Sequence, residues 1–251
     1  MAVDKVIGIT VLSGKGGVGK SVTALNLALA LGRSKGKVLL FDAAGGSLVH
    51  LTNSNPTDDT QVIKLDDNIG LYISSITDSY SILSETDIEG LLEEIVNAAR
   101  GYNCVVFDCL TGTGPVSYTL AGLSELTLLV STGDPTAIAG TYLLAKALHQ
   151  DGLAARCELI FNGVQSVDEA ASLKTRFDIL TSRFLKRTFA QSGYIHWDQA
   201  LAESVMEQRP LLQGNKISPA YRDFQRLASD ISRLNGLQFE TSTLKNLTSK
   251  G

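Results

Sequence analysis

The sequence predicts an α/β fold: a single domain with a mostly parallel, twisted β-sheet that is flanked by helices on both faces. Apolar, β-branched runs alternate along the chain with segments of helical periodicity, which is typical of such a sheet. A length of 251 residues is sufficient for one large domain with a substantial core. Hydrophobic residues make up 44% and charged residues 19%, which is the balance of a packed, soluble protein.

The apolar runs and the helical segments give the expected elements in order. Strands are expected at residues 5–12, 37–42, 70–74, 103–108, 126–131 and 157–162. Helices are expected near residues 20–34, 87–99, 135–150 and 168–186. The pattern then predicts a short strand near 193–195, a helix near 197–207, a break at Pro210 and a last helix near 217–234. Together these elements form a domain of residues 1–236.

Local turn and cap signals set the boundaries of these elements. Residues 43–68 have little periodicity and many Gly, Ser, Asn, Thr and Asp, which predicts a surface loop with at most one short turn. Ser84, with Asp87 three residues later, predicts the N-terminal cap of the 87–99 helix. Gly36 is expected to end the first helix. Residues 237–251 are expected to form a disordered or weakly amphipathic tail.

Charge and cysteine content restrict the classes of partner. A net charge of −4 and a pI near 5.4 argue against nucleic acid as a partner. The three cysteines contain no CxxC pair, which argues against an iron–sulfur cluster or a zinc site. Because the chain has neither a signal peptide nor an apolar run of about 18 residues, we expect a cytoplasmic protein. Any membrane contact should be peripheral and weak.

Residues 14–21 read GKGGVGKS between an expected strand and an expected helix, which is the pattern of a phosphate-binding P-loop. Its glycines let successive backbone N–H groups curl toward phosphate oxygens. Lys20 would neutralise the β and γ phosphates of ATP, and Ser21 would bind Mg²⁺. The alternative is a glycine-rich turn that happens to precede a helix. The nucleotide-binding residues predicted here are Gly14, Lys15, Gly16, Gly17, Val18, Gly19, Lys20, Ser21 and Val22.

The stretch from Lys15 to Ser21, KGGVGKS, resembles the signature of the deviant Walker A ATPases. This family includes the cell-division positioner MinD, the partition protein ParA and the flagellar number regulator FlhG. The resemblance implies a homodimer that encloses ATP, in which Lys15 reaches the phosphates of the partner protomer. It also implies a protein partner, whose affinity changes with the nucleotide state. A solvated lysine on a loop is the alternative for Lys15.

Two expected strands end in an aspartate, Asp42 and Asp108, at the edge of the sheet where the P-loop lies. Carboxylates there are well placed for magnesium, so the predicted metal ligands are Ser21, Asp42 and Asp108. By resemblance, Asp108 is the Walker B aspartate, and the backbone of Gly112 senses the γ phosphate. Both aspartates could instead be turn formers or helix caps.

Ala44 is the most informative departure from the family. In the family the second strand ends in Asp-x-Asp, and the second carboxylate acts on the attacking water, but this chain reads Asp42-Ala43-Ala44. General-base assistance is worth about 10²–10⁴ in rate. We therefore expect ATP binding and dimerisation with slow or absent hydrolysis, whether Ala44 is natural or introduced. A substitute carboxylate from Asp58 or Asp59 is the alternative. The predicted catalytic positions are Lys15, Lys20, Asp42 and Ala44, the last as the place of the missing aspartate.

Other segments resemble the FlhG branch of the family, which implies a role at the flagellum. They are DPTAI at 134–138 with Tyr142, NGVQSVDEA at 162–170, RFL at 183–185 and GYIHWDQAL at 193–201. By resemblance, Asn162 hydrogen-bonds the adenine edge. Gly140 stands where the branch has an aspartate, and the branch's N-terminal activator helix is expected to be missing.

Several functions remain open at this point. The first is a dimeric ATP switch that controls placement or number of a large structure. Others are a pseudo-ATPase scaffold that holds ATP constitutively, a ParA-like partition protein, a reductase or cluster carrier, and a phosphotransferase. A basic cluster on the 168–186 helix would suit an acidic partner, nucleic acid or plain solvation. Its members are Lys174, Arg176, Arg183, Lys186 and Arg187.

Overall fold

The computed structural model describes residues 6–34, 36–54, 62–77, 83–214 and 217–233. Eight strands form one sheet in the order β3-β4-β2-β5-β1-β6-β7-β8. The strands are β1 Ile7–Leu12, β2 Val38–Asp42, β3 Ile63–Asp66, β4 Ile69–Ile73, β5 Cys104–Asp108, β6 Leu126–Ser131, β7 Cys157–Val164 and β8 Ala190–His196. All neighbouring pairs are parallel except β3 with β4, which are antiparallel. The predicted fold class is confirmed.

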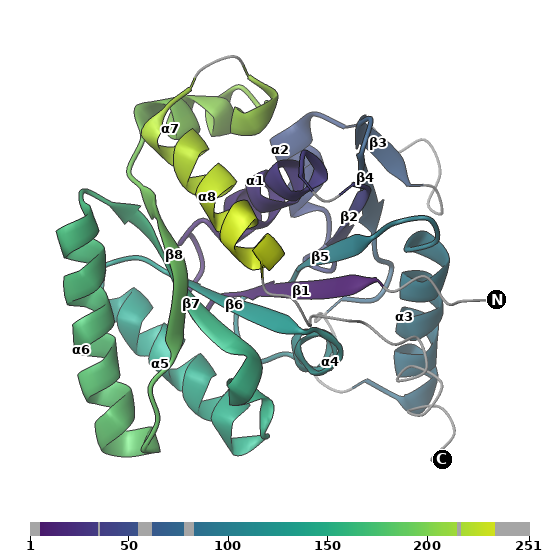
Figure 1. The fold of residues 1–251 in the computed structure, drawn as a ribbon. Helices are drawn as coiled ribbons and strands as arrows, with labels where there is room; N and C mark the ends of the chain where they lie inside the picture. The colour runs from purple at the N-terminus through teal and green to yellow at the C-terminus, as the bar shows by residue number, and fades with distance from the viewer. Residues whose placement is uncertain (1–5, 35, 55–61, 78–82, 215–216, 234–251) are drawn as a thin grey trace.

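Helices cover both faces of this sheet (Figure 1). They are α1 Lys20–Gly32, α2 Ser47–Thr52, α3 Glu85–Ala98, α4 Pro115–Leu123, α5 Pro135–Gln150, α6 Val167–Leu185, α7 Gln199–Met206 and α8 Pro219–Arg233. One buried cluster lies between the sheet and α3, α4, α5 and α6. A second buried cluster joins the opposite face to α1 and α8, with α2 beside α1.

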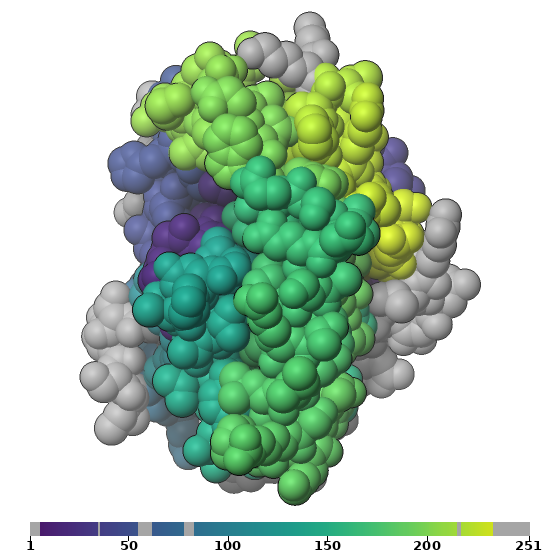
Figure 2. Space-filling model, turned by 90° about the vertical axis from the view of Figure 1, so that its left-hand side faces the viewer, coloured from purple at the N-terminus to yellow at the C-terminus, as the bar shows by residue number. Residues whose placement is uncertain are grey.

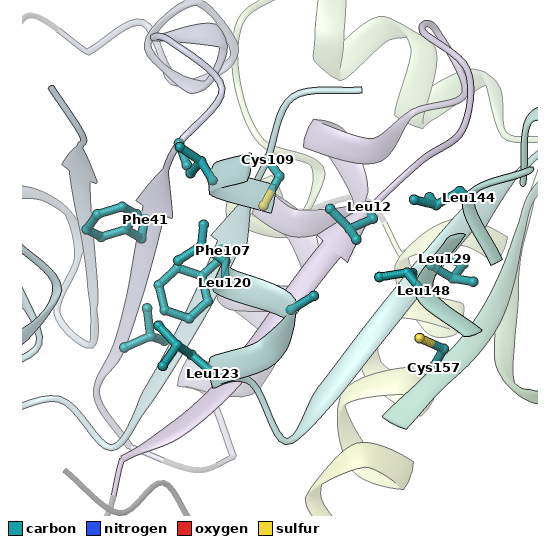
Figure 3. Close-up of a cluster of buried hydrophobic side chains, with 14 of the residues drawn as sticks. Leu12, Phe41, Phe107, Cys109, Leu120, Leu123, Leu129, Leu144, Leu148 and Cys157 are labelled. Atoms are coloured by element: carbon teal, nitrogen blue, oxygen red, sulfur yellow. The ribbon is translucent and has the colours of Figure 1, made fainter. Parts of the chain in front are cut away.

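The strands are buried on both faces, and alternate residues supply the two clusters. In β2, Leu39 and Phe41 join the cluster under α3–α6, whereas Val38 and Leu40 join the cluster under α1 and α8. Figure 3 shows the first cluster, in which strand side chains meet those of α4 and α5. Its labelled members are Leu12, Phe41, Phe107, Cys109, Leu120, Leu123, Leu129, Leu144, Leu148 and Cys157. Burial also raises the pKa of the Cys157 thiol to about 12, so this cysteine stays protonated.

Most predicted elements lie within a few residues of their expected bounds, but three were missed. The expected loop at 43–68 contains α2 and the edge strand β3, and α4 was not predicted. β3 is only four residues long, with Ile63 and Leu65 half-buried and Lys64 and Asp66 exposed. Both α2 and β3 are too short to show a clear period in the sequence.

One of the two predicted caps is correct. Ser84 and Asp87 form the expected capping box at the start of α3. Gly36 does not end the first helix, since α1 stops at Gly32 and its cap residue, Arg33, has right-handed helical geometry. Gly36 instead has a φ of 97° in the turn before β2.

Some expectations concern segments outside the described residues. These are residue 5 of the first strand, Asp58 and Asp59, residue 234 of the last helix and the tail at 237–251. Among the helices that the structure describes, none combines the length and the apolar character that crossing a bilayer requires.

Candidate functional site

The P-loop connects β1 to α1 at the edge of the sheet where the parallel strands end. Gly17 and Gly19 have φ angles of 77° and 86°, which side chains disfavour, and Gly19 is the cap residue of α1. A Cβ on Gly16 or Gly17 would meet no atom within 4 Å, so open space lies beside the loop. Figure 2 shows the purple N-terminal segment at the surface, framed by blue, teal and green segments. The loop thus has the shape and the access that a phosphate group requires.

Gly14 and Gly140 touch through their backbones. A Cβ on Gly14 would lie 2.0 Å from the Gly140 carbonyl oxygen. A Cβ on Gly140 would lie 2.5 Å from the Gly14 carbonyl oxygen. Neither backbone leaves room for a side chain. This contact requires glycine at both positions, because α5 packs directly against the P-loop.

A Gly140→Ala variant should therefore be destabilised and should bind ATP more weakly, although position 140 contributes no charge to the site. Overpacking of this kind costs about 1–3 kcal/mol of unfolding free energy. The measurement is urea denaturation together with ATP titration. Gly122→Ala is the matched control, because a Cβ on this α4 glycine has its nearest contact at 3.9 Å. Equal stability of the two variants would contradict the proposed contact.

Four side chains form a closed polar cluster behind the P-loop. Lys20 Nζ lies 2.6 Å from Asp108 Oδ1, and both side chains are buried. Ser47, the first residue of α2, donates to Asp108 Oδ2 over 3.2 Å and lies 3.3 Å from Ser21 Oγ. Lys20 Nζ completes the ring at 3.4 Å from Ser21 Oγ. Hydroxyl and carboxylate oxygens of this kind suit Mg²⁺, and the ammonium group suits a phosphate.

Asp42 lies beside Asp108 in the β2–β5 register, and each of its oxygens accepts a backbone N–H bond. Oδ1 accepts from the Ala44 N–H over 2.8 Å, and Oδ2 accepts from the Leu48 N–H over 3.0 Å. Burial raises the pKa of Asp42, the nearby Asp108 carboxylate raises it further, and the N–H bonds oppose this shift. Asp42 therefore holds the turn into α2, and of the two aspartates only Asp108 contacts the serine hydroxyls.

Lys15 extends from the P-loop to the start of α5. Its Nζ lies 3.1 Å from Asp134 Oδ2 and also donates to Thr136 Oγ1. Bonds from Thr136 and Lys15 hold the pKa of Asp134 below its usual range, so this carboxylate is charged near neutral pH. The Lys15 and Asp134 side chains are 41% and 45% exposed, so solvent reaches the ion pair.

The remaining predicted residues also lie at the P-loop. Asn162, on β7, donates from Nδ2 to the Val18 carbonyl over 2.8 Å. The Gly112 N–H donates to the Ser13 carbonyl over 3.0 Å. Val22 lies in the first turn of α1. Contacts of Asn162 with adenine, or of the Gly112 N–H with phosphate, would have to replace these bonds.

Ala44 lies half-buried in the turn after β2, three residues before Ser47, and its N–H donates to Asp42 Oδ1. Ser47 is not among the predicted site residues, because residues 43–68 were expected to form a loop and α2 was not predicted. The contact between Asp134 and Lys15 was not predicted either, although Lys15 was expected in the P-loop and Asp134 belongs to the DPTAI segment that resembles the FlhG branch. The pair spans 119 positions, and no local pattern reports such a contact.

The family model of the CobQ/CobB/MinD/ParA nucleotide binding domain matches residues 9–211. The chain belongs to this family. The MinD/ParA family membership predicted from the P-loop is thereby confirmed, and the family is one of nucleotide-binding proteins.

Individual MinD/ParA-type proteins are similar over most of their length. The antiactivator FleN of Pseudomonas aeruginosa is 29% identical over 239 residues, which cover 89% of this chain and 85% of FleN. The solved structure of the septum site-determining protein MinD from Pyrococcus horikoshii, complexed with Mg-ADP, has a TM-score of 0.70 and 19% identity, covering 92% of this chain and 98% of that one. A MinC:MinD complex from Aquifex aeolicus has a TM-score of 0.69 and 18% identity, covering 90% and 95%.

The basic cluster of α6 is only partly free in this MinD/ParA-type fold. Lys174 pairs with Asp178, and Arg187 lies over the Phe189 ring. Arg176, Arg183 and Lys186 are exposed, and Arg183 lies over the Phe184 ring. Three exposed cations on a chain of net charge −4 resemble a solvated helix face more than a nucleic-acid site.

Proposed function

We propose that this chain is an ATP-dependent, dimerising switch of the MinD/ParA type with impaired hydrolysis. It would act in the cytoplasm on the placement or number of a large structure such as the flagellum. The observation that carries the proposal is the arrangement of Lys15, Lys20, Ser21 and Asp108 around one open P-loop.

ATP and magnesium fit the residues present. The P-loop glycines offer backbone N–H groups, and Lys20 offers a buried ammonium group for the phosphates. Ser21 and Asp108 would hold Mg²⁺, which usually keeps several waters and takes other ligands from phosphates. When bound, the ion neutralises charge on the phosphate oxygens. Asp42 would support the site through the turn into α2.

Dimerisation is supported by the position of Lys15. Its ion pair with Asp134 is exposed at the P-loop, and exposed ion pairs contribute little to stability. Lys15 can therefore leave Asp134 and bind the phosphates of a second protomer at little cost in free energy. The α5 helix, which begins beside Asp134 and packs on Gly14, would then sense the change.

The flagellar assignment rests on the segments that resemble the FlhG branch, and the similarity to FleN, which is named an antiactivator, supports a regulatory role. The Aquifex structure, in which MinD is in complex with MinC, supports a protein as the partner. For this chain the partner would be a protein of the flagellar or another positioning machinery. Nucleic acid fits the net charge poorly, which places a ParA-like partition role second.

A pseudo-ATPase scaffold is the second candidate, and Ala44 favours it. Without a carboxylate at position 44, bound ATP would persist, and the dimer would be fixed rather than switched. The two candidates differ only in turnover: slow but measurable hydrolysis fits the switch, and its absence fits the scaffold. Hydrolysis at a rate ordinary for the family would eliminate the scaffold and would also show that hydrolysis is not impaired.

Light scattering after size-exclusion chromatography tests the switch. With Mg²⁺ and ATP the chain should shift from monomer to dimer, and Lys15→Ala should bind ATP but stay monomeric. Lys146→Ala removes an exposed α5 lysine away from the P-loop and should dimerise normally. If the unaltered chain binds ATP and stays monomeric, the dimeric switch is wrong.

A further inference from the structure

We propose that Ser47 is a magnesium-positioning residue, which holds the Asp108 carboxylate in place while Lys20 engages phosphate. This inference rests on the proposed function, because it assumes that the P-loop binds Mg²⁺ with ATP. It adds a residue from α2 to a site that the sequence assigned to the P-loop and to strand ends.

The geometry places the Ser47 hydroxyl between the two groups that would hold the ion. Its Oγ lies 3.3 Å from Ser21 Oγ and 3.2 Å from Asp108 Oδ2. One hydroxyl therefore contacts both proposed magnesium ligands and can orient them without being a ligand itself.

The ordinary role of a serine at a helix start does not account for this position. The cap residue of α2 is Gly46, whose left-handed geometry begins the helix without a side-chain hydrogen bond. Ser47 comes one residue later, and its hydroxyl turns to Asp108 instead of to the helix backbone. The Gly45–Gly46 turn, with φ angles of 81° and 93°, brings it there.

The site needs such a residue when its ion pair opens. Lys20 now neutralises Asp108 Oδ1, and a lysine that engages phosphate must give up this 2.6 Å contact. Asp42 cannot take over this contact, because it is itself a hydrogen-bond acceptor, which accepts from the Ala44 and Leu48 N–H groups. The Ser47 hydroxyl remains on Oδ2 and keeps the carboxylate oriented. Through Ser47, the first turn of α2 is connected to the metal site.

The test is a magnesium titration of the full chain with a fluorescent ATP analogue. Ser47→Ala should bind the analogue like the unaltered chain in EDTA. Its half-saturating Mg²⁺ concentration should rise about tenfold or more, which is typical when a group that orients a ligand is lost. Ser47→Thr keeps the hydroxyl and should restore the titration. Ser54→Ala removes a hydroxyl near the other end of α2, where it contacts Thr52, and should change nothing.

The outcomes separate this inference from the proposed function. If the unaltered chain does not bind the analogue, the proposed function fails and the role of Ser47 fails with it. If it binds, but Ser47→Ala has an unchanged magnesium dependence, only the role of Ser47 is wrong. An equal loss of affinity in EDTA and in Mg²⁺ would likewise refute it, since that pattern indicates a general defect of the loop. Thermal unfolding of each variant shows that the comparison is made on folded protein.

Discussion

Lys20→Ala should abolish useful ATP binding and destabilise the protein at the same time. The ammonium group would make charge-assisted bonds to phosphate, each worth about 1.5–3 kcal/mol, so affinity should fall by at least about tenfold to a hundredfold. In the same variant the buried Asp108 carboxylate loses its 2.6 Å partner. Leaving one member of a buried pair uncompensated costs about 3–5 kcal/mol. Calorimetric ATP titration and urea denaturation measure the two effects.

A second substitution separates these effects. Lys20→Ala combined with Asp108→Asn removes the orphaned charge, so stability should largely recover while ATP binding stays lost. Lys64→Ala is the surface control, because the Lys64–Asp67 pair is 70% and 89% exposed and contributes little. Unchanged ATP affinity in Lys20→Ala would remove the basis of the proposed nucleotide site.

Ala44→Asp should raise ATP turnover by about 10²–10⁴, which is the usual worth of a positioned general base. The backbone at position 44 is already fixed, because its N–H donates to Asp42 Oδ1 over 2.8 Å. A new carboxylate there would lie near the polar cluster without replacing an existing side-chain contact. Release of phosphate in single-turnover experiments reports the rate, and the unaltered chain provides the baseline.

Ala44→Asn is the matched control for that gain. Asparagine has nearly the same shape as aspartate but cannot accept a proton from water, so its turnover should equal that of the unaltered chain. If Ala44→Asp binds ATP normally and gains no activity, the hydrolytic defect lies elsewhere. If the unaltered chain hydrolyses ATP at the usual family rate, Ala44 is not a defect at all.

Local features of the sequence were sufficient for the fold class and for the centre of the site. Each long strand and helix carries its own period, and the P-loop residues are contiguous from Gly14 to Ser21. The errors occurred where elements are short. The six residues of α2 and the four of β3 are too few for a period, so they appeared as loop.

The sequence by itself determined that this chain has a P-loop, two aspartates at strand ends and an alanine at position 44, because these are matters of residue type and local spacing. Only the tertiary structure decided which of these groups contact one another. It pairs Lys20 with Asp108, which is 88 positions away in the chain. It also directs two backbone N–H groups to Asp42 and brings the Ser47 hydroxyl to Asp108 Oδ2. Those contacts depend on the register of parallel strands that are distant in the chain, and no short stretch of sequence encodes that register.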